Sequence, residues 1–284
     1  KDEPMKHHTT FRVGGPAEYY LRPKKEQVAE VLRLCLTYQK EYLIIGNGSN
    51  LLVSDKGISG VVIEIGKQMD EITVDGTTIY AQAGAMLSKT AHAALEAGLT
   101  GMEFAAGIPG CVGGAVVMNA GAYGGEMQDI LKSVTVLTAD GQEKELTPGE
   151  LDMSYRHSSI TEEHYMVLGV TIALEAGSQE QIRAKMEELK EKRVEKQPLE
   201  YPSAGSTFKR PEGYFAGKLI MDAGLRGFQV GGAAVSEKHC GFVINKEKAT
   251  ASDVYRLIQE VQQEVYRQFG VKLETEVKMV GDFR

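Results

Sequence analysis

Apolar and polar positions along the chain follow the period of an α-helix in four stretches. Behind Pro23, a favourable residue for the first turn of a helix, apolar side chains at positions 28, 31, 32, 35 and 36 form one face. Three later stretches show helical spacing, with apolar residues at positions 91, 94 and 95, at 182, 186 and 189, and at 254, 257, 258, 261 and 265. Gly98 and Gly270 are expected to end the first and the last of these helices. The expected N-caps of these three helices are Ser88, Ser178 with Gln181 in a capping box, and either Thr250 or Ser252.

Short runs rich in β-branched and apolar residues lie between the predicted helices. They are bounded by Gly, Asp or Asn, and Asp140-Gly141 after one of them is a strong hairpin signal. Only some runs alternate with helices, which predicts an α+β protein rather than a regular doubly wound sheet. The predicted strands are Tyr42–Ile45, Val61–Ile65, Thr78–Ala83, Ser133–Thr138, Met166–Leu174 and Gly241–Ile244.

The length of the chain predicts two domains or one large one. It has 284 residues, and domains average about 150 residues. The charged stretch 187–198 is the best candidate boundary, because the character of the sequence changes after Gln197-Pro198. A weaker boundary falls near residues 66–70.

Charge and cysteine content narrow the class of protein. A net charge of −7 argues against general nucleic-acid binding, although one local basic pocket for a small anion remains compatible with it. Cys35, Cys111 and Cys240 lie far apart and form no CxxC pair, which argues against a disulfide scaffold or a structural zinc. We therefore expect a reducing, cytoplasmic setting. The chain shows no apolar signal core and no stretch of about 18 apolar residues, so no membrane insertion is expected.

Glycine is enriched, and its first cluster follows a predicted strand in the sequence Ile44-Ile45-Gly46-Asn47-Gly48-Ser49-Asn50-Leu51-Leu52. Bare backbone N–H groups in such a turn can cradle a phosphate. A dinucleotide fingerprint of the Rossmann type needs a third glycine and a following helix, and residues 53–60 have no helical period. We therefore reject a Rossmann fold. The glycine-rich turn is then interpreted either as a phosphate-binding turn or as an ordinary β-turn.

A second cluster, residues 101–125, holds eight glycines and a single charge, Glu103. A segment with so little polarity is expected to lie inside the protein, lining a flat and partly apolar ligand with its backbone N–H groups. A flavin fits that description. The alternative is tight packing of a helix against a strand, but the two clusters together favour a bound dinucleotide.

Seven motifs in this order resemble one known family. They are residues 10–17 (TFRVGGPA), 46–52, 107–115, 119–124, 155–158 (YRHS), 202–209 (PSAGSTFK) and 273–277 (LETEV). The set is similar to the UDP-N-acetylenolpyruvoylglucosamine reductase (MurB) family of peptidoglycan synthesis. The resemblance covers nearly the whole chain, and only about 45 residues separate Tyr155 from Pro202. That spacing looks like the shorter form of the family, which lacks a tyrosine-bearing loop over the substrate.

The resemblance implies a fold and its division. An FAD-binding module of the vanillyl-alcohol-oxidase (PCMH) type would comprise two α+β subdomains, residues 1–65 and 66–195. A C-terminal α+β substrate-binding domain, residues 196–284, would cap the flavin.

The resemblance also implies a reaction and three catalytic residues. NADPH reduces FAD, and flavin N5 then gives a hydride to the enolpyruvyl double bond of UDP-N-acetylglucosamine enolpyruvate, forming UDP-N-acetylmuramate. Arg156 would bind the enolpyruvyl carboxylate, for which a guanidinium offers paired donors and a permanent charge. Glu276 would hydrogen-bond near the same carboxylate, and Ser206 would protonate the carbanion carbon. Taken singly, each of these residues would be interpreted as an ordinary surface or turn residue.

FAD is expected to be bound without a covalent link, although His7 and His8 could suggest one. His7 stands where the motif would lead us to expect asparagine. The residues expected to contact FAD are Arg12, Gly46, Asn47, Gly48, Ser49, Asn50, Leu51, Gly107, Ile108, Pro109, Gly110, Gly113, Gly114, Asn119, Ala120, Gly121, Tyr123 and Gly169.

Residues 203–230 carry a net charge of +2 inside an acidic chain, which suits a pyrophosphate. Arg210 stands where the longer form of the family tends to carry asparagine. The residues expected to bind the nucleotide substrate are Lys209, Arg210, Lys218, Arg226, His239 and Asn245. For the last two, the alternative is ordinary hydrogen-bonded structure.

Two other functions stay open at this point. Another FAD-dependent oxidoreductase of the same fold, such as a hydroxy-acid or lactone oxidase, would share the two glycine clusters. It would not need Arg156, Ser206 and Glu276 together. A non-catalytic UDP-sugar-binding protein is the third reading. The sequence leaves the oligomeric state and the preference for NADPH over NADH open.

Overall fold

The computed structural model describes every residue from Lys1 to Arg284 and divides them into two compact units. The first unit combines Lys1–Tyr20, Gly48–Val61 and Val194–Arg284, and the second combines Leu21–Asn47 and Val62–Arg193. Each unit is therefore assembled from separate stretches of sequence. The predicted division into residues 1–65, 66–195 and 196–284 stays a prediction.

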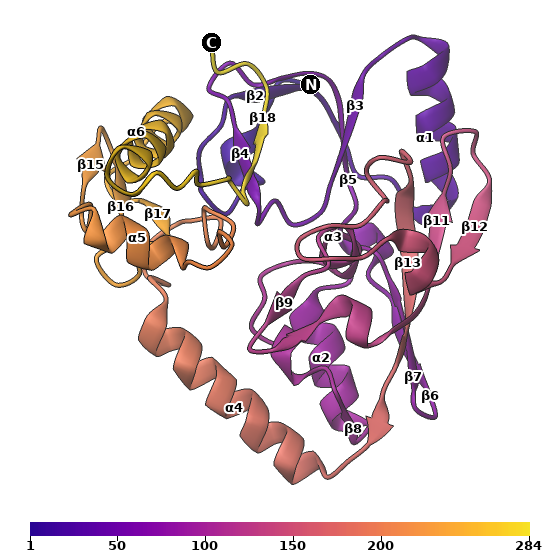
Figure 1. Cartoon of the computed structure of the whole chain (residues 1–284). Coiled ribbons are helices and arrows are strands. Elements are labelled where there is room, and N and C mark those ends of the chain that lie inside the picture. The colour runs from indigo at the N-terminus through magenta and orange to yellow at the C-terminus, as the bar shows by residue number, and fades with distance from the viewer. The chain divides into compact units, whose positions relative to one another are not determined.

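The second unit is built on a five-stranded antiparallel sheet of order β12-β11-β13-β7-β6 (Figure 1). The central strand β13 is almost wholly buried, as its continuous apolar run predicts. Gly141, with a φ of +84°, closes the β11–β12 hairpin and confirms the turn predicted at Asp140-Gly141. The strands are β6 (Ile72–Asp75), β7 (Thr78–Gln82), β11 (Leu131–Leu137), β12 (Glu143–Leu146) and β13 (Met166–Ala173).

Three helices lie wholly within this unit: α1 (Lys25–Thr37), α2 (Leu87–Glu96) and α3 (Val112–Val117). The predicted apolar face of α1 is confirmed at Val28, Leu32 and Cys35, which are buried, but not at Leu36, which is exposed at the end of the helix, and Val31 is half-buried. The prediction that Ser88 caps α2 is wrong, because the helix already begins at Leu87 with Met86 as its N-cap. Helix α3 was not predicted, since its two glycines have low helix propensity.

The first unit holds a large apolar core beneath α6 (Ala251–Phe269). The predicted face of this helix, at positions 254, 257, 258, 261 and 265, is fully buried. Of the two predicted caps, Thr250 is the one used: its Oγ1 accepts from the N–H of Asp253 at 3.0 Å, and Gly270 ends the helix in a left-handed conformation. Beside α6 lie α5 (Ala216–Asp222) and the antiparallel sheet of β15 (Gln229–Val230), β16 (Ala233–Val235) and β17 (Val243–Asn245).

Strands distant in sequence also pair in the first unit. β4 (Leu51–Val53) pairs in parallel with β18 (Lys278–Val280), so the chain after the first glycine cluster lies against the C-terminal segment. β1 (Glu3–Pro4) pairs antiparallel with β2 (Pro16–Leu21). β5 (Ile58–Glu64) belongs to a sheet of order β1-β2-β5-β3 and leads the chain into the second unit. The range predicted for β3, Tyr42–Ile45, is confirmed.

Helix α4 (Gln179–Lys196) returns the chain to the first unit. The N–H of Gln181 lies 3.5 Å from Ser178 Oγ, in keeping with the predicted cap, and Ile182, Met186 and Leu189 are its buried residues. No helix in the protein combines the length and the apolar character needed to cross a bilayer.

The remaining elements are short. Two small antiparallel pairs are β8 (Leu99–Thr100) with β14 (Glu175–Ala176), and β9 (Gly121–Ala122) with β10 (Gly125–Glu126). The 3-10 turns lie at Met5–His7, Lys67–Met69, Glu103–Ala105, Met127–Asp129 and Pro148–Leu151.

Candidate active site

The two glycine clusters contact each other in the second unit. Asn47 Nδ2 donates to the carbonyl of Pro109 at 2.9 Å. A Cβ placed on Gly46 would lie only 2.2 Å from Cys111 Sγ, so the sulfur fills the space that a side chain would take. Burial raises the pKa of the Cys111 thiol, and backbone N–H groups at Gly114 and Asn47 oppose that rise. The structure thus brings together two segments that the sequence separates by about 60 residues.

Several glycines of the second cluster serve close packing. A Cβ on Gly113 would lie 2.8 Å from the Cβ of Ala83, which lets α3 approach the end of β7. A Cβ on Gly125 would lie 2.7 Å from the Phe104 ring. Packing of backbone against its neighbours, the alternative considered for this cluster, therefore accounts for these positions. Gly124 is different: its φ is +90°, and nothing lies within 4 Å of its missing Cβ.

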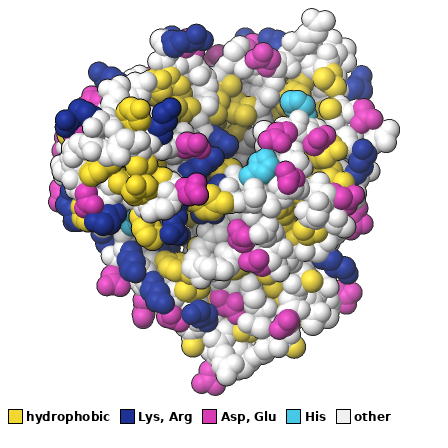
Figure 2. Space-filling model, in the orientation of Figure 1, with side chains coloured by type: hydrophobic (Ala, Val, Ile, Leu, Met, Phe, Trp, Pro, Cys, Tyr) yellow, Lys and Arg dark blue, Asp and Glu magenta, His cyan; other side chains and the backbone are white.

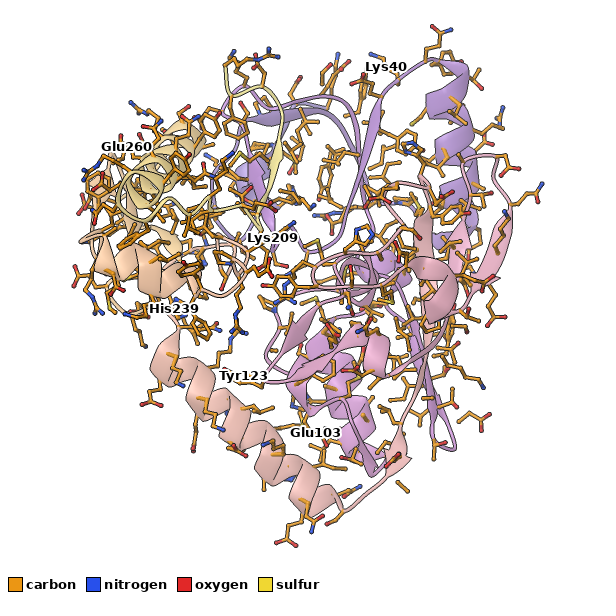
Figure 3. All side chains as sticks on the ribbon, in the orientation of Figure 1. Lys40, Glu103, Tyr123, Lys209, His239 and Glu260 are labelled. Atoms are coloured by element: carbon orange, nitrogen blue, oxygen red, sulfur yellow. The ribbon has the colours of Figure 1, made fainter.

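Gly169, another residue predicted to contact FAD, is also a packing position. It lies on β13 beside β7, and a Cβ there would stand 2.5 Å from the hydroxyl of Tyr80. Tyr123 lies between β9 and β10 with its side chain half exposed (Figure 3).

A buried polar atom without a partner lies beside the first cluster in the first unit. The Oγ1 of Thr10 is buried and makes no hydrogen bond, while the N–H of Thr10 donates to the carbonyl of Gly48 at 3.3 Å. Gly48 has a φ of +61°, and a Cβ there would lie 1.9 Å from the carbonyl oxygen of His8. An orphaned hydroxyl next to a bare turn is what a ligand with phosphate or ring oxygens would satisfy. These residues therefore fit FAD.

His8 is fully engaged with protein. Its Nε2 lies 2.8 Å from Glu3 Oε1, and its Nδ1 lies 2.9 Å from the hydroxyl of Tyr20. Both ring nitrogens of His8 are therefore engaged with protein side chains, and non-covalent binding of FAD stays a prediction.

Ser206 and Glu276 come together in the first unit, although 70 residues separate them. The N–H of Glu276 donates to the carbonyl of Thr207, the residue after Ser206, at 2.9 Å. Asn50 of the first glycine cluster donates from Nδ2 to the carbonyl of Glu276 at 3.1 Å. The backbone of Glu276 is therefore held between the segment of Ser206 and the first glycine cluster.

Arg156 belongs to the second unit and occupies a tight turn. Its φ is +58°, and its Nη2 donates to the carbonyl of Gly121 at 3.2 Å. Ser154 and His157 exchange two backbone hydrogen bonds around it, each 3.1 Å long. The arginine therefore has a constrained backbone, held against the second glycine cluster.

Four of the residues predicted to bind substrate make contacts with their neighbours in the first unit. Lys209 Nζ lies 3.4 Å from Glu274, and Lys218 Nζ lies 2.7 Å from Asp222. The guanidinium of Arg210 lies 4.0 Å from the centroid of the Phe215 ring. Arg226 donates to the carbonyl of Glu237 at 2.7 Å. The two lysines form exposed ion pairs, which contribute little to stability, whereas the contact of Arg210 is a cation–π contact.

Asn245 and His239 are more committed to the protein. Asn245 donates from Nδ2 to the carbonyl of Phe11 at 3.1 Å and accepts at Oδ1 from the N–H of Ala249 at 2.8 Å. His239 Nδ1 accepts from the N–H of Gly241 at 3.1 Å, and burial lowers the pKa of this half-buried ring. These contacts favour the structural alternative for both residues, and direct substrate contact stays a prediction.

The structure also points to residues that sequence reasoning missed. Thr10 belongs to the motif at residues 10–17, but the sequence gives no reason to expect a contact with a cofactor there. Its buried Oγ1, which makes no hydrogen bond, is what indicates one. In the sequence, Cys111 is only one of three cysteines that lie far apart. No pattern indicates that its sulfur contacts Gly46. On the face shown in Figure 2, Lys and Arg side chains are interspersed with Asp and Glu rather than gathered into one basic surface.

Comparison with known proteins places the chain in a class. Residues 17–147 match the FAD binding domain family. Together with the two glycine clusters and the orphaned hydroxyl beside them, this defines an FAD-dependent oxidoreductase. Residues 197–280 match the family described as UDP-N-acetylenolpyruvoylglucosamine reductase, C-terminal domain.

Similarity to whole proteins identifies the family. A UDP-N-acetylenolpyruvoylglucosamine reductase of Agathobacter rectalis is 59% identical over 295 residues, covering 100% of this chain and 94% of the relative. One from Clostridium perfringens is 55% identical over 281 residues, covering 99% and 92%. The crystal structure of the reductase from Thermus caldophilus matches with a TM-score of 0.86 and 36% identity over 99% of this chain and 98% of that one. The chain belongs to the UDP-N-acetylenolpyruvoylglucosamine reductase family.

Proposed function

We propose that this protein reduces UDP-N-acetylglucosamine enolpyruvate to UDP-N-acetylmuramate with NADPH, as a cytoplasmic step of peptidoglycan synthesis. Family membership supports the substrate and the product. The observation that carries the proposal is the hydrogen-bonded arrangement of Asn50, Glu276 and the Ser206–Thr207 segment, since it unites a cofactor-binding turn with two predicted catalytic residues.

When bound, FAD supplies the chemistry that accepts a hydride from NADPH and passes one to the enolpyruvyl double bond. Residues of both glycine clusters would hold it, with Thr10 as an additional donor or acceptor. Because both nitrogens of His8 are occupied by Glu3 and Tyr20, we expect no covalent link. Acid precipitation should leave the yellow colour in the supernatant, and colour in the pellet would contradict this assignment.

Arg156 binds the enolpyruvyl carboxylate in this proposal. Negative charge develops on that group and on the adjacent carbon during reduction, so a permanent positive charge stabilises the developing anion. Glu276 hydrogen-bonds near the same carboxylate, and its backbone contacts with Asn50 and Thr207 support a fixed position for its side chain.

Ser206 delivers the proton to the carbon next to the carboxylate. A serine hydroxyl is a weak acid, so its contribution depends on being held at the right place. The adjacent Thr207 provides that support: it is 1% exposed, its N–H donates to Gly241 at 2.8 Å, and its Oγ1 accepts from Val243 at 2.9 Å.

The nucleotide part of the substrate is assigned to the first unit. Lys209, Arg210, Lys218 and Arg226 would face the pyrophosphate. The exposed ion pairs of Lys209 and Lys218 support this, because water-screened ion pairs are readily exchanged. His239 and Asn245 complete the proposed set, with contacts that favour a supporting role for both.

An anaerobic flavin spectrum tests the proposal. FAD-loaded protein should bleach on addition of NADPH and regain its absorbance when the enolpyruvyl nucleotide is added. UDP-N-acetylglucosamine, which has no alkene, is the matched control and should leave the flavin reduced. Failure to take up FAD, or turnover of a hydroxy acid with O₂ in place of the nucleotide reaction, would overturn the assignment.

A further inference from the structure

The turn that carries Arg156 is fastened to the second glycine cluster at three points. Ser158 Oγ donates to the carbonyl of Val117 at 2.9 Å. Asn119 Nδ2 donates to the carbonyl of Ser154 at 3.0 Å. Arg156 itself donates to the carbonyl of Gly121 at 3.2 Å. Ser154 and Ser158 flank Arg156 in the turn, and all three residues are bonded to the segment 117–121. The arginine is therefore held on both sides of its own position.

Asn119 is the central attachment, and it is completely buried. Its carboxamide makes two further bonds: Nδ2 also donates to Glu126 Oε2 at 3.1 Å, and Oδ1 accepts from the N–H of Gln128 at 3.0 Å. Three of the four hydrogen bonds that an asparagine side chain can make are therefore formed with protein. Its φ is +39°, a region that asparagine tolerates better than most residues.

We propose that Asn119 is a positioning residue for Arg156. Its side chain spans from the glycine cluster to Ser154, the first residue of the turn, and so sets where the guanidinium stands relative to the segment that lines the flavin. The sequence suggested a contact between Asn119 and FAD, whereas the bonds of its side chain support this second role. The inference rests on the proposed function, because it takes Arg156 to be the carboxylate-binding group.

Loss of the Asn119 amide would remove the bond that ties the carbonyl of Ser154 to the glycine cluster, and that carbonyl would keep only its bond from the N–H of His157 within the turn itself. The turn would relax by breaking that contact. Because the backbone of Arg156 is in the left-handed region, the turn depends on its neighbours to stay in this conformation. A displaced guanidinium would bind the carboxylate less well, while groups that bind the nucleotide would be unaffected.

The test compares two ligands on FAD-saturated, oxidised protein, in which no reduction takes place. Calorimetry measures the affinity for the enolpyruvyl nucleotide and for UDP-N-acetylglucosamine, which lacks the carboxylate. The ratio of the two affinities isolates the carboxylate contact. We expect Arg156→Ala to lower this ratio by about tenfold to a hundredfold, the usual range for a charge-assisted hydrogen bond. Asn119→Ala should lower it by about tenfold, and should have no added effect when Arg156 is already alanine.

A matched control removes another buried hydrogen bond of the same unit. Thr138 is 4% exposed, and its Oγ1 bonds to Gln142 in the β11–β12 hairpin. Thr138→Val should lower the melting temperature and leave the affinity ratio unchanged, because this hairpin holds no part of the Arg156 turn. If Asn119→Ala does not fold, Asn119→Gly removes the same amide without straining the backbone at a φ of +39°, and it should lower the ratio in the same way.

The outcomes separate the inference from the function on which it rests. If Arg156→Ala lowers the ratio and neither Asn119 variant does, Asn119 is not a positioning residue and the proposed role of Arg156 stands. If Arg156→Ala leaves the ratio unchanged, the carboxylate assignment fails and the inference fails with it. A fall in the ratio with Thr138→Val as well would show a general effect of destabilisation and would also overturn the inference.

Discussion

Asn50 donates from Nδ2 to the backbone carbonyl of Glu276 at 3.1 Å, across 226 residues of sequence. The carbonyl of Asn50 in turn accepts from the N–H of Lys278 at 2.9 Å, where β4 and β18 begin to pair. A residue of the predicted cofactor-binding turn thus holds the backbone of a predicted catalytic residue.

Substitution of Asn50 should therefore impair the second half-reaction. Asn50→Ala leaves the carbonyl of Glu276 without this partner, and we expect the rate of flavin reoxidation by the enolpyruvyl nucleotide to fall about 100-fold at saturating FAD. Asn47→Ala is the matched comparison, since it removes a side-chain bond to Pro109 from the same turn and does not touch Glu276. Stopped-flow absorbance of the flavin measures both variants, and equal reoxidation rates would contradict the prediction.

Gly46 should be intolerant of a side chain because of Cys111. The Cβ of Gly46→Ala would stand 2.2 Å from Cys111 Sγ, and overpacking of this kind costs about 1–3 kcal/mol of unfolding free energy. With Cys111→Ala as the background, the nearest remaining contact is the Cβ of residue 111 at 3.8 Å. The same substitution should then cost less than about 0.5 kcal/mol.

Denaturant unfolding of the four proteins in this cycle gives the coupling directly. Gly149→Ala is the control, because nothing lies within 4 Å of its missing Cβ and its φ is not in the left-handed region. That control should unfold like the parent protein. A Gly46→Ala penalty that persists without the sulfur would show that the clash with Cys111 is not its cause.

Ser206 should matter only for protonation. Ser206→Ala is expected to slow flavin reoxidation by about 10²–10⁴-fold, the usual effect of losing a positioned proton donor. Flavin reduction by NADPH should keep its rate, and affinity for the nucleotide should change little. An unchanged reoxidation rate would remove Ser206 from the mechanism.

His239 should make the stability of the protein depend on pH. Burial lowers the pKa of this ring, and the N–H of Gly241 donates to its Nδ1, which requires that nitrogen to be unprotonated. The folded protein therefore binds fewer protons here than the unfolded chain, so the stabilisation is complete above the ordinary histidine pKa of about 6.5 and is lost as the pH falls below it. Unfolding free energies measured from pH 7.5 to 5 should fall more steeply for the parent than for His239→Gln. Parallel curves would contradict this.

Sequence patterns were most informative where one face of an element is buried. Helix α6 shows this best, because its apolar spacing, its Thr250 cap and its terminal Gly270 all agree. Helix α3 shows the opposite case: Val112–Val117 contains two glycines, and one of them, Gly113, permits the close approach of the helix to Ala83. Tertiary packing there overrides a low propensity, and no local pattern could reveal it.

The candidate site was accessible to sequence reasoning only as a set of motifs. Ser206 and Glu276 were recognised by resemblance, but the pairing of Thr207 with Glu276 connects segments that no spacing rule links. The amide of Asn119 looked like a cofactor contact because it lies in a glycine-rich segment. Its bonds to Ser154, Glu126 and Gln128 depend on how three loops meet in the folded chain, and no local sequence pattern indicates that meeting.

The discontinuous make-up of the first unit has a consequence for biosynthesis. Its segment Lys1–Tyr20 is translated before most of the second unit, yet most of the first unit's residues, Val194–Arg284, are translated after it. Strand β4 must wait for β18, so the nascent polypeptide exposes unpaired edges and apolar surface until residues 278–280 have been translated. Chaperone dependence during synthesis is therefore expected to centre on the N-terminal residues, and a premature stop codon even a few residues before position 278 would deprive the cofactor-binding turn of its partner strand.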